Sequence, residues 1–170
     1  GAGKGVWAKY YGNRKAMNAG IGGDRTQHVL WRLENGNIKG IKPKLAVIMI
    51  GTNNSRDDSS ENIAKGILAI VDKLHTELPQ TKVLVLAIFP RGEGPDNANR
   101  KVNEGANQIV QAAAGSKNFE YLDIGPYYLT PEGTISKAIM PDLLHLSPPG
   151  YAIWAEAIEP KLSEMLGEAK

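Results

Sequence analysis

The sequence predicts an α/β fold in which a parallel sheet carries helices on both faces. Two continuous apolar runs, at residues 45–50 and 83–88, have the composition of central strands that are covered on both sides. A segment with apolar residues at helical spacing follows each run, at about residues 60–78 and 97–114. This alternation is typical of doubly wound sheets, so we expect three layers, α/β/α.

Length and composition limit the classes of protein to consider. With 170 residues, we expect one domain over residues 1–170. The net charge is +2 and no basic run stands out, so nothing indicates a nucleic-acid or membrane surface. The chain has no Cys, which excludes disulfides and thiolate metal ligands. The longest apolar run is too short to span a bilayer. The compartment, cytoplasmic or secreted, stays open.

The segment before the first apolar run carries turn and helix signals. Residues 16–18 are expected to form a short strand ahead of a glycine-rich turn. Asp24 is expected to cap a helix that reaches about Leu33 and stops at Asn35 and Gly36.

The C-terminal part continues the same pattern. Residues 119–124 are predicted to be another strand, and the Gly- and Pro-containing residues 125–141 an irregular excursion. Ser147 is expected to cap the last helix, with Pro148 at its first position and its end near Leu166.

Three segments are expected at the carboxyl ends of the strands, where function gathers in such sheets. Gly20–Asp24 is a glycine-rich turn that could cradle a phosphate or offer N–H groups to an oxyanion, but it lacks nucleotide-loop spacing. Gly51–Asn54 follows the first apolar run, and its amides either form a turn or donate to an oxyanion. The third segment holds Asp142 and His145.

Asp142 and His145 stand three residues apart, so one turn of backbone brings both side chains to one side. A carboxylate there can accept from one imidazole nitrogen and leave the other free to act as a base. The alternative is structural, with Asp142 capping a turn and His145 exposed.

Taken together, these segments resemble the SGNH hydrolases, also called the GDSL esterase family. Gly20–Asp24 is similar to the second block of that family, Gly51–Asn54 to the third, and Asp142–His145 to the fifth. The resemblance is closest to the branch that contains the catalytic subunits of platelet-activating-factor acetylhydrolase Ib, through residues 22–36, 42–44 and 90–92.

The resemblance implies a flavodoxin-like sheet and hydrolysis of short-chain, acetyl-type esters by a Ser-His-Asp mechanism. His145 would be the general base and Asp142 its orienting carboxylate. Gly23, through its backbone N–H, and Asn53, through its side-chain amide, would be oxyanion donors. No metal and no organic cofactor is implied, and the partner would be a small ester.

One family block does not occur in this sequence. The first block, Gly-Asp-Ser, follows the first strand of the family and supplies the nucleophilic Ser. Gly1–Lys4 is similar to the text downstream of that block, so the resemblance implies an N-terminally truncated domain that lacks the usual first strand. Ser147 is better explained as a helix cap, and Ser55 lies in a polar loop.

Two classes of function therefore stay open. One is an ester hydrolase whose nucleophile-bearing segment is absent from this chain, which would be poorly active alone. The other is a catalytically silent binding or assembly module with the same fold. Residues 16–18 and 45–50 are expected to flank a gap in the sheet, filled by a rearranged N-terminus, a complementing N-terminal peptide or a second copy in a homodimer. Arg91 is expected to be a solvated loop cation unless it contacts a substrate, and Trp31 to pack within its helix.

Overall fold

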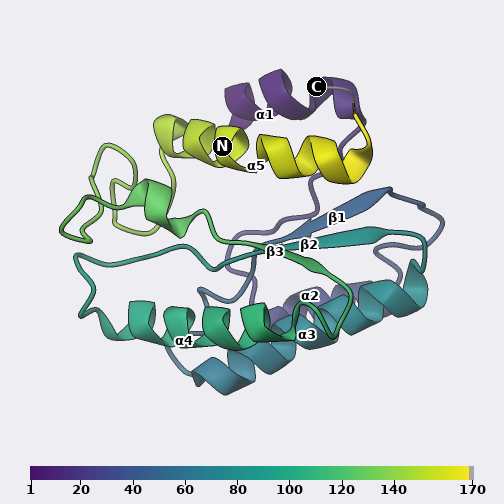
Figure 1. Ribbon diagram of the computed structural model, residues 1–170, viewed down its shortest axis with the longest axis horizontal. Helices are drawn as coiled ribbons and strands as arrows, with labels where there is room; N and C mark the ends of the chain where they lie inside the picture. Colours follow the sequence, from purple (N-terminus) through teal and green to yellow (C-terminus); the bar gives the residue numbers. More distant parts are fainter. Residues whose placement is uncertain (169–170) are drawn as a thin grey trace.

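The computed structural model describes residues 1–168 and shows a parallel three-stranded sheet with helices on both faces (Figure 1). The strand order is β1-β2-β3, with β1 at Leu45–Ile48, β2 at Lys82–Leu86 and β3 at Glu120–Leu122. Helix α3 (Ser60–Glu77) connects β1 to β2, and α4 (Ala98–Ala113) connects β2 to β3. The α/β class and the parallel sheet are as predicted.

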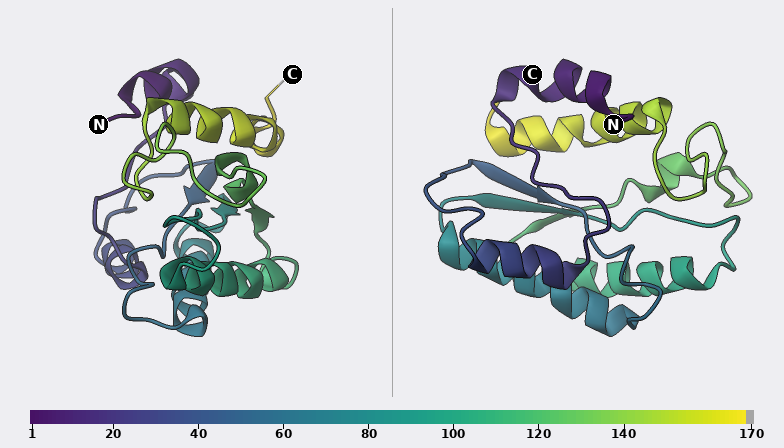
Figure 2. Two further views of the ribbon diagram at one scale, coloured as in Figure 1. Left: turned by 90° about the vertical axis from the view of Figure 1, so that its left-hand side faces the viewer. Right: turned by 180° about the vertical axis from the view of Figure 1, so that it is seen from behind.

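Two helical layers enclose the sheet. Helices α2 (Thr26–Glu34), α3 and α4 lie on one face, whereas α1 (Lys4–Tyr11) and α5 (Pro148–Leu166) lie on the other (Figures 1 and 2). Each face has its own apolar cluster. Ile63 and Ile67 of α3 are buried on the first face, and Leu84 of β2 packs with Ile158 and Leu162 of α5 on the second.

The last helix begins as predicted. The Ser147 hydroxyl accepts a hydrogen bond from the Gly150 N–H at 3.3 Å, and Pro148 occupies the first helical position. The same hydroxyl donates to the Ala138 carbonyl at 2.6 Å. Ser147 is thus fully engaged as a cap.

The strand predicted at residues 16–18 is wrong. That segment runs past the sheet without pairing in the described chain, and β1 is an edge strand. The physical reason is that a strand needs a neighbour to satisfy its N–H and C=O groups, and no strand described here lies between residues 16–18 and β1.

The start of α2 also differs from the prediction. Arg25, not Asp24, is the N-cap residue, and its N–H donates to His28 Nδ1 at 3.2 Å. The Asp24 carboxylate instead accepts both arms of the Arg32 guanidinium, with Nη1 to Oδ1 at 2.9 Å. The helix ends at Glu34 with Asn35 as its C-cap, in agreement with the predicted stop at Asn35 and Gly36. Trp31 does not pack as predicted, because 63% of its surface is exposed.

The first helix, α1, was not predicted. It packs against α5, and Arg14, which follows it, donates to Glu159 Oε2 at 2.8 Å. The aromatic side chains of Trp7 and Tyr11 lie on this helix with their ring centroids 5.0 Å apart. Among residues 1–168, no helix has the length and apolar character needed to cross a membrane.

Candidate active site

The Asp142 and His145 side chains meet in a turn ahead of α5. Asp142 Oδ2 lies 2.7 Å from His145 Nδ1, so the expected hydrogen bond is present. Asp142 Oδ1 accepts the His145 N–H at 2.7 Å and the Leu144 N–H at 3.1 Å. Because Nδ1 faces a carboxylate, it carries the proton and leaves Nε2 free as an acceptor. Since 79% of the His145 side chain is exposed, a reactant can approach it.

The same contacts set the charge of the carboxylate. Hydrogen bonds from the His145 ring, and then from its backbone N–H, lower the pKa of Asp142 to about 2. The carboxylate is therefore ionised throughout the neutral range, as an orienting group for an imidazolium must be.

The two predicted oxyanion donors belong to segments that touch. Asn53 Nδ2 donates to the backbone carbonyl of Asp24 at 2.9 Å, which joins the loop after β1 to the residue that follows Gly23. The second hydrogen of this amide has no acceptor among the described residues. Gly23 has φ +82°, an arrangement that suits glycine, and its exposed N–H has no acceptor in the described chain either.

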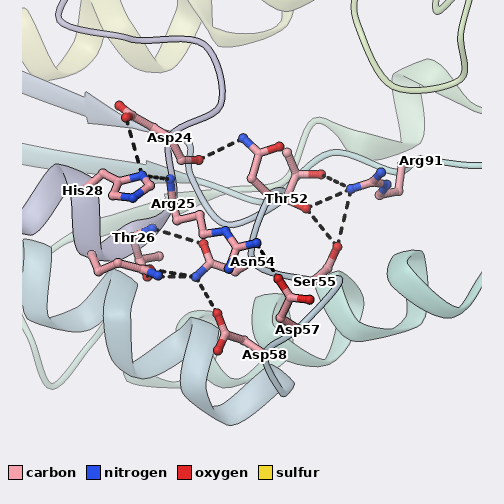
Figure 3. Close-up of polar contacts among 12 residues, drawn as sticks. Asp24, Arg25, Thr26, His28, Thr52, Asn54, Ser55, Asp57, Asp58 and Arg91 are labelled. Atoms are coloured by element: carbon pink, nitrogen blue, oxygen red, sulfur yellow. Dashed lines mark hydrogen bonds and ion pairs between the residues drawn. The ribbon is translucent and has the colours of Figure 1, made fainter.

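Asn54 joins the start of α2 to the loop after β1 through its side chain (Figure 3). Its side chain is 2% exposed and accepts the Thr26 N–H at 3.1 Å. Its amide nitrogen donates to Gln27 Oε1 at 3.0 Å and to Asp58 Oδ2 at 2.8 Å. Its amide nitrogen and oxygen both bond within the protein, so Asn54 is a structural link between α2 and the loop after β1.

Arg91 is not the solvated cation that the sequence suggested. The residue is 8% exposed, and its Nη1 donates to the Thr52 carbonyl at 2.8 Å and lies 3.2 Å from the Thr52 hydroxyl (Figure 3). The next residue, Gly92, donates its N–H to the Leu143 carbonyl at 2.9 Å. Leu143 lies between Asp142 and His145. These contacts connect the Asn53 loop to the Asp142–His145 turn at the carboxyl edge of the sheet.

A cavity of about 770 Å³ opens beside this connection. Its walls come from the loop at residues 91–97 and from the turn at residues 142–144, with Arg56 also contributing. Asp142 and the two residues between it and His145 lie in the wall, so the turn that carries the pair borders a space large enough for a small molecule.

Ser55 and Ser147, the two serines considered as replacements for the nucleophile, are held in other contacts. Ser55 is 4% exposed and donates to the Thr52 carbonyl at 2.9 Å, and Ser147 caps α5. No His, Cys, Asp and Glu side chains within residues 1–168 form a group of three that could hold a metal ion.

Sequence reasoning missed the roles of Asn54 and Arg91. Both are polar residues in segments that read as loops, where exposure is the usual state. The Pro90-Arg91-Gly92 segment, which is similar to the family branch, was the available signal for Arg91, but the burial of Arg91 depends on contacts with residues about forty positions away.

Comparisons with known proteins place the chain in a family. Residues 4–153 match the model of the GDSL-like Lipase/Acylhydrolase family. The alpha1 subunit of human platelet-activating factor acetylhydrolase IB is 42% identical over 164 residues, which is 96% of this chain and 70% of that protein. The alpha2 subunit from Rattus norvegicus is 40% identical over 96% of this chain and 71% of that protein.

A solved structure agrees at the level of the fold. A variant of an acetyl-xylooligosaccharide esterase from Geobacillus Stearmophilus superposes with a TM-score of 0.72 at 18% identity, over 97% of this chain and 78% of that one. The family match covers the segments that carry the Asp142–His145 pair, Asn53 and Gly23. The chain belongs to the GDSL-like lipase/acylhydrolase family.

Proposed function

We propose that this chain carries the general base and two oxyanion donors of an esterase for acetyl-type carboxylic esters. The observation that supports it most is the Asp142–His145 hydrogen bond, at 2.7 Å, in a turn tied through Gly92 and Arg91 to the loop that holds Asn53. A base with a free Nε2 and amide donors along one edge of a sheet suits acyl transfer.

The nucleophile is proposed to come from a segment outside residues 1–170, because Gly-Asp-Ser does not occur in this sequence. A serine hydroxyl delivered there would attack the ester carbonyl, and His145 Nε2 would take its proton. The carbonyl oxygen would become an oxyanion held by the Gly23 N–H and the Asn53 amide. The ester C–O bond then breaks, and the imidazolium gives its proton to the departing alcohol. Water repeats the sequence and releases the acid.

An acetyl group is the favoured acyl part because it is common to relatives with different alcohols. Two relatives are named as acetylhydrolases of platelet-activating factor, and a structural neighbour is named as an acetyl-xylooligosaccharide esterase. The names share the acetyl group and differ in what it is attached to. The proposal therefore names the acyl group and leaves the alcohol open.

The outer edge of β1 is where the proposed segment would join the sheet. Lys44 O accepts from the Lys82 N–H at 3.0 Å, so residues 44, 46 and 48 point their polar groups at β2. Leu45 and Val47 consequently point theirs away from it, because the direction alternates along a strand. A strand that ends in Gly-Asp-Ser would pair there and bring its serine to the carboxyl edge.

The decisive experiment compares three proteins with p-nitrophenyl acetate. They are residues 1–170 alone, the chain with an added hydrophobic strand ending in Gly-Asp-Ser, and the same extension ending in Gly-Asp-Ala. The Ser-bearing protein should exceed both others by roughly 10³-fold or more in kcat/KM, since removing a triad member leaves only weak residual catalysis. His145→Ala in the Ser-bearing protein should remove most of the gain.

Other outcomes would change the proposal. Full activity in residues 1–170 alone would mean that another group attacks, and Ser147→Ala and Ser55→Ala would test which. A folded extended protein without any gain would contradict the esterase proposal and favour the silent binding or assembly module.

A further inference from the structure

We propose that Arg91 is a positioning residue that holds the Asn53 amide in register with the Asp142–His145 pair. This inference rests on the proposed function, because it assigns Asn53 a role at the oxyanion. Arg91 also lies in the wall of the cavity, but the role proposed here is indirect. It would act through the peptide that joins Thr52 to Asn53, whose carbonyl oxygen lies 2.8 Å from Arg91 Nη1.

The contacts of Arg91 converge on one short loop. Nη1 donates to the Thr52 carbonyl and lies 3.2 Å from the Thr52 hydroxyl and 3.4 Å from the Ser55 hydroxyl. Ser55 Oγ itself donates to the Thr52 carbonyl at 2.9 Å. The carbonyl immediately before Asn53 is therefore fixed by two donors. The Arg91 guanidinium thus helps to fix the peptide plane from which the Asn53 side chain extends.

The connection from Arg91 to the Asp142–His145 turn is made by the backbone of the next residue, Gly92. Gly92 donates its N–H to the Leu143 carbonyl at 2.9 Å, and Leu143 has φ +59°, which is unusual for a residue with a branched side chain. A Cβ built on Gly92 would lie 2.4 Å from the Asn97 side chain, and Gly92 has φ +75°. A side chain at residue 92 would be strained there, and the hydrogen bond from Gly92 ties the residue after Arg91 to the turn.

Arg91 differs from an ordinary ion-pair arginine. No carboxylate in the described chain pairs with it, and its partners are neutral oxygens of the loop. Burying a guanidinium among neutral acceptors is costly. The buried contacts therefore act on loop geometry and not on charge neutralisation. Burial, and then the nearby Arg56, lower the pKa of Arg91, but a guanidinium stays charged at any working pH.

Arg100 provides a matched control. It is 3% exposed, and its Nη1 donates to a backbone carbonyl, that of Gly133, at 2.7 Å. It thus resembles Arg91 in burial and in its carbonyl partner, although its Nε also pairs with Glu104 at 3.1 Å. The loop that it holds carries none of the proposed site residues. A purely structural effect of losing a buried arginine should appear in Arg100→Met as well as in Arg91→Met.

The first measurement needs no activity. In residues 1–170, the side-chain amide of Asn53 gives its own NMR signals. Arg91→Met should shift and broaden these signals, because the preceding carbonyl loses a donor. Arg100→Met should leave them in place, although both variants lower the Tm by similar amounts. Unmoved Asn53 signals in a folded Arg91→Met protein would overturn the proposal.

The second measurement uses the protein extended by the Gly-Asp-Ser strand. Arg91→Met should lower kcat by roughly 10- to 100-fold, since a misplaced donor loses part of its value in the transition state. KM should change by less than about threefold, because the ground-state ester makes little use of that donor. The pH–rate profile should keep its shape, since Asp142 and His145 bond within their own turn.

Arg91→Lys keeps a cationic donor and should recover part of the lost kcat, whereas Arg100→Met should retain the parent kcat. A loss that appears equally in Arg100→Met, or one confined to KM, would overturn the positioning role. An extended parent protein without activity would instead contradict the proposed function and leave the Asn53 signals as the test of Arg91.

Discussion

Asp142 accepts hydrogen bonds from the Leu144 N–H, the His145 N–H and the His145 ring, all within one turn of chain. Such a short-range set of bonds holds the carboxylate in place although 56% of its side chain is exposed. At the scale of single residues, the orientation of His145 is thus a local property that does not depend on burial.

Asp142→Asn tests that orientation. In the Ser-bearing extended protein, kcat should fall by roughly 10²- to 10⁴-fold, because an amide can present N–H to Nδ1 and favour the wrong tautomer. KM should stay close to the parent value. Asp123→Asn is the control, since Asp123 also accepts a local N–H, that of Gly125 at 2.7 Å. Equal losses of kcat in the two variants would show that Asp142 has no special role.

The pH dependence of Asp142 follows from its lowered pKa of about 2. A folded-state value below the unfolded value of about 3.9 means that the stabilising contribution is complete above pH ~4 and is lost as the pH falls toward 2. A ¹³C NMR titration of residues 1–170 should show this low value. His145→Ala should raise the pKa of Asp142, because the hydrogen bond from the His145 side chain is the largest cause of the lowered value. A carboxyl that titrates near pH 4 in the parent protein would contradict this prediction.

At the scale of elements, the loop after β1 depends on close approach of the backbone to the core. Gly51 has φ +128°, and a Cβ built there would lie 2.6 Å from Ile88 Cδ1 and 2.8 Å from Ile63 Cγ2. The loop that carries Asn53 and Asn54 can leave the strand at this point only because residue 51 has no side chain.

Gly51→Ala should therefore lower the free energy of unfolding by about 2–4 kcal/mol, from backbone strain together with overpacking. Gly36→Ala is the matched control. Gly36 has φ +93° but nothing within 4 Å of a built Cβ, so only the backbone cost of about 1–2 kcal/mol should appear. Urea unfolding of both variants measures the difference, and equal losses would show that the Ile63 and Ile88 contacts relax freely.

At the scale of the whole molecule, the sheet of the described residues has two edge strands, β1 and β3, and the proposed extension concerns β1. Helices cover both faces, but the outer edge of β1 has no strand beside it in the described residues, and 41% of the Val47 surface is exposed. Figure 2 shows this strand at the margin of the sheet when the molecule is seen from behind. An open apolar edge of this kind invites pairing with another strand.

Amide hydrogen exchange on the whole chain should show this asymmetry. In residues 1–170, Val47 should exchange faster than Ala46, because its N–H points away from β2. The extension that ends in Gly-Asp-Ser should slow exchange at Val47 markedly and leave Leu84, which is paired on both sides, unchanged. Fast exchange at Val47 in the extended protein would show that the added strand does not pair there.

The sequence alone determined the features that depend on near neighbours in the chain. The apolar runs of β1 and β2, the Ser147 cap and the Asp142–His145 spacing all act over a few residues, so their patterns are readable without a fold. The other features depend on contacts between segments that are far apart in the chain. Residues 16–18 do not form a strand because pairing needs a neighbour, and Arg91 is buried because Thr52 and Ser55 surround it. Those outcomes depend on which distant segments come into contact, and this cannot be predicted from the composition of a short segment.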